Sequence, residues 1–350
     1  NLGKSMKKKI AIVFGTRPEA IKMLPVIKEA KDRSNEIETI VVNTGQHKEM
    51  CDDIMEYFAI KPDIDFAIMK PDQTLSSITA SVLEKATSLF AELRPDVVLV
   101  HGDTTTAFAV SLACFYLKIS VGHVEAGLRT LDFKSPFPEE MNRTFIDMVS
   151  DYFFAPTKKN EQNLLNENVN KDKIIVTGNT VIDAVQFVAQ SLIERKYTPG
   201  FLADLQKFHR GNLNGQNYIL VTAHRRESFG KPFENICEGL KKVAALYPSM
   251  SFVYPVHLNP RVKEVVFEKL FKEKNILLLE PQEYQNFVWL MMNSKLIISD
   301  SGGIQEEGPA LKKQVVIMRD TTERPEIIES KWGFLAGTNP ETILKSTVAA

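Results

Sequence analysis

The stretch that decides the fold is Asp96-Val97-Val98-Leu99-Val100-His101-Gly102-Asp103-Thr104. An apolar run of strand length ends in a small polar turn, and a helix-like segment follows at residues 105–117. A second short apolar run, at residues 120–124, ends in Glu125. Parallel α/β sheets bind ligands outside the carboxyl ends of their strands, and this order places Asp103 and Glu125 there.

A third acid, Glu139, lies a few residues further along the chain. Pro138 is expected at the first position of a helix, which would set Glu139 and Arg143 on one face, four residues apart. Taken alone, Glu139 is better explained as an acid that complements a helix N-terminus and pairs with Arg143. The three acids together suit proton transfer in one crevice, so we predict a catalytic role for Asp103, Glu125 and Glu139.

Length and composition indicate two domains of ordinary size with well-filled cores. The chain has 350 residues, of which 44% are hydrophobic and 25% charged. The formal net charge of −1 gives no reason to expect binding to nucleic acid or to an anionic membrane. The three cysteines, Cys51, Cys114 and Cys237, are scattered and odd in number. This pattern predicts reduced, mostly buried thiols in a cytosolic protein.

The first apolar run, at residues 10–14, superficially resembles the core of a secretory signal. It stops at Gly15 after five residues, which is too short for that role. No other run approaches the length that a membrane-spanning helix needs. We therefore expect a cytoplasmic protein that does not associate with membranes.

Short apolar runs alternate with amphipathic segments of helix length, which is typical of doubly wound α/β domains. In the first half we expect strands at residues 9–14, 37–43, 97–100, 121–124, 152–155 and 173–177. Helices are expected there at residues 18–33, 50–58, 75–93, 105–117, 139–149 and 157–167. In the second half we expect strands at residues 218–222, 252–256, 276–279, 295–299 and 315–318.

A domain boundary is predicted near Gly178, with a helix at residues 183–195 leading away from it. The first domain, residues 6–178, would carry the acids, and the second, residues 179–350, would bind a nucleotide. No long linker separates these halves. We therefore predict two Rossmann-like domains that face a central cleft.

The corner Gly15-Thr16-Arg17-Pro18-Glu19 lies where the first strand turns into the first helix. A Rossmann unit usually binds phosphate there, but the G-x-G-x-x-G pattern is absent, so NAD is not expected. Arg17 and Lys22 are candidates to meet an anionic group of a ligand. Ordinary surface positions on an amphipathic helix would explain them almost as well.

The strongest single signal in the second half is Ser299-Asp300-Ser301-Gly302-Gly303-Ile304-Gln305-Glu306-Glu307. A strand runs into Ser-Gly-Gly at a helix start, which would leave backbone N–H groups of Ser301, Gly302 and Gly303 free for a diphosphate. Glu307 would then be placed to accept hydrogen bonds from ribose hydroxyls. The alternative is a tight turn before a capped helix.

Charged side chains follow two other strands of the second half. His224, Arg225 and Arg226 come after the strand at 218–222, and Arg324 comes after the strand at 315–318. Several arginines at neighbouring strand ends indicate an anionic ligand. His47, His101, His123 and His257 also flank expected strand ends. Because neither H-E-x-x-H nor a Cys/His cluster is present, no metal is predicted.

With these segments in order, the sequence closely resembles the non-hydrolysing UDP-N-acetylglucosamine 2-epimerases. The resemblance covers the chain from the first strand nearly to the end. The matching segments are residues 14–19, 43–47, 101–106, 123–129, 136–143, 177–180, 224–227, 300–307 and 319–325.

This resemblance implies a glycosyltransferase type-B architecture in which the second domain holds most of the UDP. It also implies a homodimer that interconverts UDP-GlcNAc and UDP-ManNAc without a cofactor. The positions that match family catalytic residues are Asp103, Glu125, Glu139 and His224. The positions that match substrate contacts are Arg17, Lys22, Arg143, Ser301, Gly302, Gly303, Glu307 and Arg324.

Many bacterial members of that family are activated by a second UDP-GlcNAc molecule. The positions linked to the activator site are matched by Gln46, Gln73, Arg225 and His257. Asp72 departs from the pattern, because some relatives carry a basic residue there.

The expected mechanism begins with departure of UDP, because the C2–H of the sugar is not next to a carbonyl and is otherwise not acidic. Loss of the C2 proton would give 2-acetamidoglucal, and reprotonation of the other face with return of UDP would invert C2. The product would supply ManNAc-type sugars for cell-surface polysaccharide. A hydrolysing epimerase, a retaining glycosyltransferase and a non-catalytic UDP-sugar sensor are the alternatives. The products formed from UDP-GlcNAc alone distinguish all four.

Overall fold

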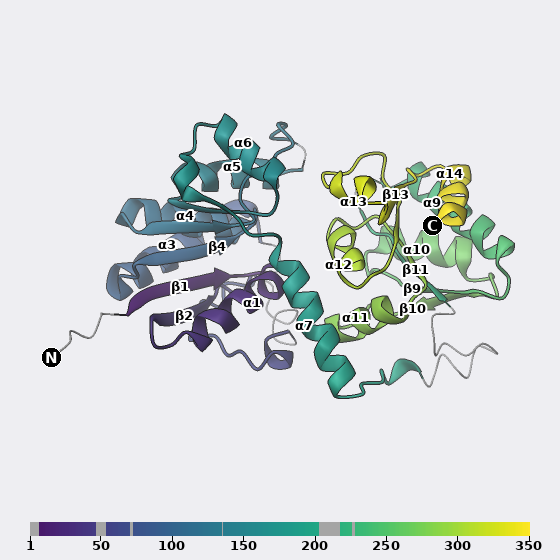
Figure 1. Ribbon diagram of the computed structural model, residues 1–350, viewed down its shortest axis with the longest axis horizontal. Helices are drawn as coiled ribbons and strands as arrows, with labels where there is room; N and C mark the ends of the chain where they lie inside the picture. Colours follow the sequence, from purple (N-terminus) through teal and green to yellow (C-terminus); the bar gives the residue numbers. More distant parts are fainter. Residues whose placement is uncertain (1–6, 47–53, 71–72, 135, 203–217, 226–227) are drawn as a thin grey trace. The chain divides into compact units, whose positions relative to one another are not determined.

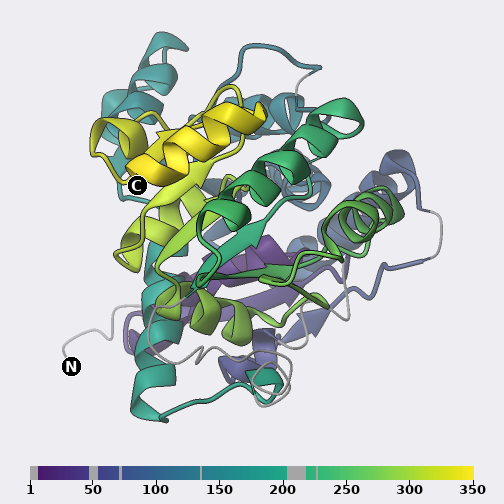
Figure 2. The same ribbon diagram turned by 90° about the vertical axis from the view of Figure 1, so that its right-hand side faces the viewer.

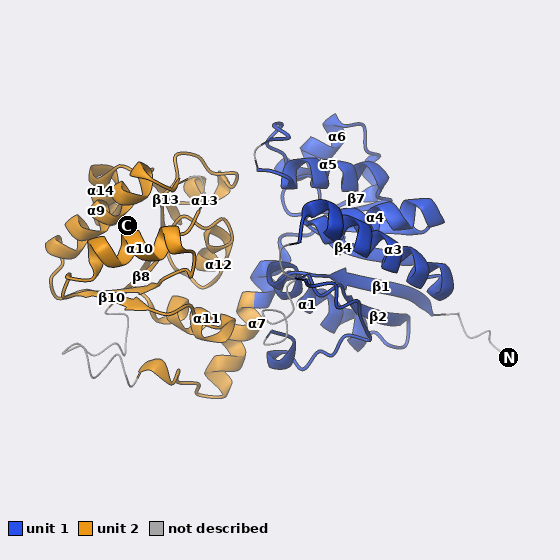
Figure 3. Ribbon diagram, turned by 180° about the vertical axis from the view of Figure 1, so that it is seen from behind, with its two compact units in different colours: residues 1–184 blue, residues 185–350 orange. Residues whose placement is uncertain are grey.

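The computed structural model describes residues 7–46, 54–70, 73–134, 136–202, 218–225 and 228–350. The chain divides into two compact units, residues 1–184 and residues 185–350, coloured blue and orange in Figure 3. The division falls inside helix α7 (Thr180–Glu194), and unit 2 begins six residues after the start of the predicted second domain. The two units are called unit 1 and unit 2 below.

The described part of unit 1 contains one parallel sheet of seven strands, in the order β3-β2-β1-β4-β5-β6-β7. The strands are β1 (Lys8–Phe14), β2 (Ile37–Asn43), β3 (Ile64–Asp65), β4 (Val97–His101), β5 (Ser120–Val124), β6 (Tyr152–Ala155) and β7 (Ile174–Val176). The helices are α1 (Arg17–Asp32), α3 (Leu75–Leu93), α4 (Thr105–Leu117), α5 (Glu139–Val149) and α6 (Lys158–Asn166), labelled in Figure 1.

The central strands of this sheet are buried on both faces, which their apolar sequence allows. Along β1, Ala11 and Val13 belong to the cluster formed with α3 and α4. Ile12 and Phe14 alternate with them, are also fully buried, and therefore lie on the opposite face. Helix α1 packs against β1 and β2, so helices cover both faces of the sheet.

The sheet order reverses between β1 and β4, which are hydrogen-bonded neighbours although α1, β2, β3 and α3 lie between them in sequence. In an open parallel sheet such a topological switch point leaves a crevice at the carboxyl ends of the strands. The turns at this point begin at Gly15 after β1 and at Gly102 after β4. The fold therefore brings two of the polar turns singled out in the sequence to one edge.

Unit 2 repeats this arrangement. Its described part contains a parallel sheet of six strands in the order β10-β9-β8-β11-β12-β13, with the reversal between β8 and β11. The strands are β8 (Tyr218–Thr222), β9 (Ser251–Pro255), β10 (Ile276–Leu279), β11 (Leu296–Ser299), β12 (Val315–Ile317) and β13 (Gly333–Leu335). The helices are α9 (Lys231–Leu246), α10 (Pro260–Leu270), α11 (Tyr284–Asn293), α12 (Ile304–Ala310), α13 (Glu326–Glu329) and α14 (Pro340–Ala349).

The C-terminal helix α14 packs on α9, and Figure 2 shows the yellow helix lying beside the green one. Gly239 permits this close approach, because a Cβ there would lie 2.9 Å from Cδ1 of Ile343. The second core lies between these helices and the sheet. Its largest buried side chains include Phe233, Phe252 and Tyr254.

The predicted pair of Rossmann-like α/β domains is confirmed at the level of strands, helices and their order. Two strands were missed, β3 and β13, which are two and three residues long and lie at the sheet edges. Residues 171–173 form a 3-10 helix and not the start of β7, because the Asn170 side chain caps them. Helix α7 begins at Thr180, three residues before the predicted start. Of the helix predicted at 50–58, residues 54–57 are helical and 50–53 lie outside the described residues.

Cys114 and Cys237 are buried free thiols, and burial raises the pKa of each to about 12, so both are poor nucleophiles. Cys51 lies outside the described residues. Within the described ranges, none of the helices combines the length and the apolar character needed to cross a bilayer. The same ranges contain no cluster of three or more His, Cys, Asp or Glu side chains that could hold a metal ion.

Candidate functional site

The candidate site of unit 1 lies at the switch point between β1 and β4. A pocket of about 280 Å³ opens there, and Asp103 and Glu139 both line it. The other lining residues are Thr16, Pro18, Gln46, Leu75, Thr104, Thr105, Pro138 and Asn142. The structure thus brings two of the three predicted acids to one cavity.

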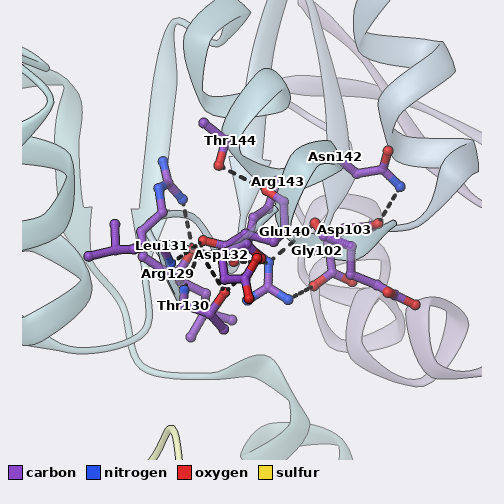
Figure 4. Close-up of polar contacts among 12 residues, drawn as sticks. Gly102, Asp103, Arg129, Thr130, Leu131, Asp132, Glu140, Asn142, Arg143 and Thr144 are labelled. Atoms are coloured by element: carbon purple, nitrogen blue, oxygen red, sulfur yellow. Dashed lines mark hydrogen bonds and ion pairs between the residues drawn. The ribbon is translucent and has the colours of Figure 1, made fainter. Parts of the chain in front are cut away.

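Helix α5 holds Asp103 from two directions, as Figure 4 shows. The Nη2 of Arg143 lies 2.7 Å from Oδ2 of Asp103, and Asn142 Nδ2 donates to the Asp103 backbone oxygen at 2.9 Å. Burial raises the pKa of Asp103, and this effect outweighs the opposing charge of Arg143, while Glu125 and Glu139 add to the rise. Asp103 therefore holds a proton more readily than an ordinary aspartate does.

The pKa of Glu125 is shifted in the opposite direction, downward. Its Oε2 accepts from Lys22 Nζ at 2.5 Å and from Asn179 Nδ2 at 2.7 Å, and His101 Nε2 lies 3.6 Å away. Burial alone would raise the pKa of Glu125, but Lys22 and then His101 outweigh burial and hold it well below its ordinary value. Glu125 is therefore kept as a carboxylate.

The backbone of Glu125 has a φ of +71°, which is strained for a residue other than glycine. Its N–H and that of Ala126 both donate to the Phe154 carbonyl, at 3.1 and 3.2 Å, and these bonds hold the turn. Strain of this kind persists where the surrounding structure imposes it, often at functional sites.

Glu139 is the first residue of α5, and Pro138 is the residue before the helix and not its first residue, as was predicted. The expected ion pair between Glu139 and Arg143 is not formed. The Arg143 guanidinium pairs with Asp103 instead, and only the backbone oxygen of Glu139 accepts from its Nε, at 3.4 Å. The predicted pairing with Arg143 is therefore wrong, whereas the predicted place of Glu139 in the first turn of a helix is confirmed, and Glu139 also lines the pocket.

Glu19 ties the two turns of this switch point together and was not singled out as a functional residue. Its buried carboxylate accepts from the N–H groups of Gly15 and Thr16, at 3.0 and 2.8 Å, and from Thr104 Oγ1 at 2.6 Å. Burial raises the pKa of Glu19, although these hydrogen bonds oppose the rise. The sequence signal was the capping-box spacing of Thr16 and Glu19 at the start of α1.

Some of the remaining candidates of unit 1 contact the site, and others lie outside it. Arg17 is the first residue of α1 and is half-buried, and Lys22 contacts Glu125 directly. Gln46 lines the pocket and accepts from Thr106 Oγ1 at 2.8 Å. Gln73 donates to the Ile68 carbonyl, within the loop before α3. His47 and Asp72 lie outside the described residues.

In unit 2 the switch point between β8 and β11 joins the other predicted turns. The buried carboxylate of Asp300 accepts from the N–H groups of His224 and Arg225, each at 2.8 Å. Thr222 Oγ1 and Ser299 Oγ are 2.8 Å apart at the ends of the same strands. The turn after β8 is therefore held against the turn after β11. Arg226 and Glu227 lie outside the described residues.

Two arginines converge on Gly302. A Cβ built there would lie 2.9 Å from Arg324 Nη1 and 3.0 Å from Arg225 Nη2. The Ser301 N–H donates to Ser299 Oγ at 2.9 Å, so the prediction that this amide is free is wrong. The amides of Gly302 and Gly303 have no acceptor within the described ranges. Two guanidinium groups beside two such amides form an environment for an anion.

Two further candidates of unit 2 contact neighbouring side chains. The rings of His224 and His257 stack with centroids 5.2 Å apart, and burial lowers the pKa of His224. Glu307 is buried and accepts from the Tyr284 hydroxyl at 2.9 Å. Arg324 pairs with Glu306, with Nε 2.9 Å from Oε2. The four catalytic candidates are thus divided, with the acids in unit 1 and His224 in unit 2.

Sequence reasoning missed one contact partner of Glu125, Asn179. It lies in the segment 177–180, which was used to place the domain boundary and as a family match but not as part of the site. An amide that contacts a carboxylate 54 positions away gives no local pattern to detect.

Comparison with known proteins gives one consistent match. Residues 29–350 match the family model described as UDP-N-acetylglucosamine 2-epimerase. Over 336 residues the chain is 50% identical to the UDP-N-acetylglucosamine 2-epimerase of Salmonella typhimurium, covering 96% of this chain and 88% of that protein.

Solved structures give the same result. UDP-GlcNAc 2-epimerase from Neisseria meningitidis bound to UDP-GlcNAc superposes with a TM-score of 0.88 at 47% identity, covering 97% of this chain and 90% of that one. UDP-GlcNAc 2-epimerase from Methanocaldococcus jannaschii, in complex with UDP-GlcNAc and UDP, superposes with a TM-score of 0.81 at 35% identity, covering 97% and 92%.

Proposed function

The chain belongs to the UDP-N-acetylglucosamine 2-epimerase family of isomerases, and we propose that it interconverts UDP-GlcNAc and UDP-ManNAc by inverting C2 of the sugar. The observation that carries the proposal is the unequal state of two acids at neighbouring strand ends, Asp103 after β4 and Glu125 after β5. Lys22 and His101 hold Glu125 ionised, whereas burial favours a proton on Asp103. Acids whose environments push their pKa values apart are suited to different roles, here proton exchange by Asp103 and charge stabilisation by Glu125.

The reaction requires the C1–O bond to break before the C2 proton is acidic. UDP departs with the bonding electrons, C1 becomes cationic, and a carboxylate then takes the C2 proton to leave neutral 2-acetamidoglucal. Protonation of C2 from the other face, with return of a UDP oxygen to C1, completes the inversion. Protons and charge balance over the cycle, and no oxidant is needed.

We assign the acids by their surroundings. Asp103 and Glu139 line the same pocket and exchange the C2 proton on the two faces of the sugar. Glu125 stays ionised beside Lys22 and stabilises the positive charge that develops at C1. A positioned acid or base typically contributes about 10²–10⁴-fold to the rate.

UDP is assigned to residues of unit 2. The amides of Gly302 and Gly303 and the guanidinium groups of Arg225 and Arg324 suit a diphosphate, because the positive groups stabilise UDP as it leaves. Ser301 contributes its side chain, and Glu307 accepts from the ribose hydroxyls. Two similar proteins support a UDP-sugar as the ligand, since one was solved with UDP-GlcNAc and another with UDP-GlcNAc and UDP.

Incubation of the protein with UDP-GlcNAc alone, followed by NMR of the products, tests the proposal. UDP-ManNAc in equilibrium with UDP-GlcNAc is the expected result. Free ManNAc and UDP would indicate a hydrolysing epimerase, and transfer that needs an added acceptor would indicate a glycosyltransferase. Unchanged UDP-GlcNAc that nevertheless binds would indicate a sensor. Any of these three outcomes would overturn the proposed reaction.

The proposal extends to a homodimer in the cytoplasm that supplies ManNAc-type sugars for surface polysaccharide. Large apolar side chains on the adjacent helices α4 and α5 support association, since Phe115 is 58% exposed, Tyr116 62% and Met148 77%. Sedimentation of the protein before and after Phe115→Glu tests this, and a wild-type monomer would contradict it.

A second UDP-GlcNAc is proposed as an activator that depends on Gln46, Gln73, Arg225 and His257. The rate should then rise sigmoidally with UDP-GlcNAc concentration. Gln73→Ala should make that dependence hyperbolic. Turnover itself should remain, because Gln73 is not among the residues that line the acid pocket. A hyperbolic curve for the wild type would remove the activator from the account.

A further inference from the structure

His123 lies in the middle of a buried chain of polar groups in unit 1. Its side chain is fully buried on β5, below the strand ends that carry the acids. The ring Nδ1 is 2.6 Å from Asp147 Oδ1, and the ring Nε2 is 2.7 Å from the carbonyl oxygen of Gly102. Both distances are short hydrogen bonds, so each ring nitrogen has one defined partner.

The chemistry of these partners decides where the ring protons are. A carbonyl oxygen can only accept, so Nε2 must carry a hydrogen to bond Gly102. Asp147 is an acceptor as well, because its Oδ2 receives the N–H of Gly127 at 3.1 Å and Arg129 Nη2 at 2.8 Å. A carboxylate on one side and a carbonyl on the other require a hydrogen on both ring nitrogens.

The ionisation of Asp147 agrees with this geometry. Burial by itself would raise the pKa of Asp147, but His123 and Arg129 outweigh burial and hold it below its ordinary value. The charges then alternate outward from the ring, because Arg129 pairs with Asp147 and also with Glu167, through two contacts of 2.6 Å. Pairing of this kind makes burial of charged groups possible.

The groups around the ring from the other elements are accounted for. β4 supplies His101, whose pKa is lowered first by burial and also by the charge of His123. β6 supplies the uncharged Phe153, which is the register partner of His123. Asp147 from α5 is the acidic group in hydrogen-bond contact with the ring.

The carbonyl that His123 holds belongs to the residue before Asp103. Gly102 has a φ of +64°, a conformation that glycine adopts without strain, and its peptide sets the direction in which Asp103 leaves β4. Asn142 holds the next carbonyl, and Arg143 holds the Asp103 carboxylate. Helix α5 therefore fixes this acid at three successive points, one of them through Asp147 and His123.

We propose that both ring nitrogens of His123 carry a hydrogen, one donated to Asp147 and the other to the Gly102 carbonyl, and that His123 is a positioning residue for Asp103 through that carbonyl. The protonation state follows from the geometry alone. The effect on turnover rests on the proposed function, in which Asp103 exchanges the C2 proton.

The ring state is tested in the unmodified protein by ¹⁵N NMR with labelled histidine. The six histidines give few signals, and those of His123 are identified by their loss in His123→Gln. At about pH 7.5 both ring nitrogens of His123 should show the shifts of nitrogen that carries hydrogen, whereas an ordinary histidine has one unprotonated ring nitrogen there. A signal from an unprotonated ring nitrogen of His123 at this pH would overturn the proposal.

The positioning role is tested with two amides that imitate different halves of the ring. The amide nitrogen of His123→Gln falls near the position of Nε2 and can donate to Gly102, whereas that of His123→Asn falls near Nδ1 and can donate only to Asp147. His123→Asn should lower kcat by about 10²-fold, the scale of a misplacement near 1 Å. His123→Gln should keep a kcat about tenfold higher than His123→Asn. UDP affinity and KM should stay near the wild-type values.

Glu167→Gln is the matched control, since it weakens the outer pair with Arg129 and leaves the Asp147–His123 contact in place. Its kcat should equal that of the wild type. Equal kcat values for the Gln and Asn variants, at equal thermal unfolding midpoints, would refute positioning through Gly102. A wild-type protein that does not turn over UDP-GlcNAc would refute the proposed function instead, and the NMR result would still decide the state of His123.

Discussion

The two switch points of this protein share a device and differ in their chemistry. In unit 1 a buried carboxylate, Glu19, accepts two successive backbone N–H groups and joins the turns after β1 and β4. In unit 2 Asp300 does the same for His224 and Arg225, and joins the turns after β8 and β11. The shared device ties together the two turns at each reversal of strand order.

The candidate functional groups at the two switch points differ in charge. Unit 1 presents carboxylates whose ionisation is set by buried partners, as with Glu125 beside Lys22. Unit 2 presents amides and the guanidinium groups of Arg225 and Arg324. The comparison teaches that the α/β topology supplies the location of a site, whereas a few strand-end residues decide between proton transfer and anion binding.

The largest effects are expected from the acids of unit 1. Asp103→Asn, Glu125→Gln and Glu139→Gln should each lower kcat by about 10²–10⁴-fold, because each removes a positioned acid or base. UDP affinity should be retained, since UDP is assigned to unit 2. Glu84→Gln, which alters an exposed acid on α3, is the control and should have wild-type kcat. Near-normal turnover in any one of the three would remove that residue from the mechanism.

Removing the partner of Glu125 should alter both activity and stability. In Lys22→Met the burial of Glu125 is no longer opposed by Lys22, so the pKa of Glu125 should rise and the acidic limb of the kcat profile should move to higher pH. Breaking a buried ion pair costs about 3–5 kcal/mol of unfolding free energy. The lowered pKa of Glu125 gives stability above its ordinary value of 4.5, and this stability is lost as pH falls through the folded-state value.

A pH series of kcat and of urea unfolding measures both effects. Lys28→Met changes an exposed lysine of the same helix and should leave the pH profile in place. An acidic limb in the same position for Lys22→Met and the wild type would contradict the assigned state of Glu125.

The shared carboxylate device should fail differently in the two units. Glu19→Ala and Asp300→Ala each leave two backbone N–H groups without their acceptor, at a cost of about 1–3 kcal/mol for each such group. Glu19→Ala should lower turnover and spare UDP affinity, whereas Asp300→Ala should lower UDP affinity. Urea unfolding measures the loss of stability, a turnover assay measures activity, and calorimetry measures UDP affinity. The comparison would break down if both variants lost the same function.

The smallest effects are expected at the glycine pair of unit 2, Gly302 and Gly303. In Gly302→Ala the new Cβ displaces the ends of Arg225 and Arg324, which are flexible and can move, so UDP affinity should fall by about tenfold. Gly303→Ala meets Glu307 Oε2 at an ordinary contact of 3.5 Å and should cost less. Calorimetry with UDP ranks the two, and the reverse order would argue against an arginine-flanked diphosphate site.

The apolar runs of β1, β4 and β8 made the fold predictable from sequence, because a fully buried parallel strand must be apolar on both faces. The edge strands β3 and β13 escaped prediction because two or three residues carry no detectable period. The predicted Glu139–Arg143 pair failed for a different reason. Helix spacing allowed it, but the tertiary contact between Arg143 and Asp103 replaced it.

Asp103, Glu125 and the Ser-Gly-Gly turn could be placed from sequence because they follow strands closely. What the sequence could not give is the set of partners that fix their ionisation. Asn179 contacts Glu125 across 54 positions, and His123 reaches Asp147 across 24 positions. Such contacts depend on the finished sheet order and leave no local pattern.

The central claim is that C2 is inverted by elimination and readdition, and one isotope experiment tests it most directly. UDP-GlcNAc carrying ¹⁸O in the bridge between C1 and the phosphate is incubated with the enzyme in heavy water, and the products are analysed by NMR and mass spectrometry. The account predicts deuterium at C2 of the epimerised sugar and ¹⁸O scrambled into non-bridging phosphate positions. Epimerised product with hydrogen retained at C2 and ¹⁸O retained in the bridge would contradict it.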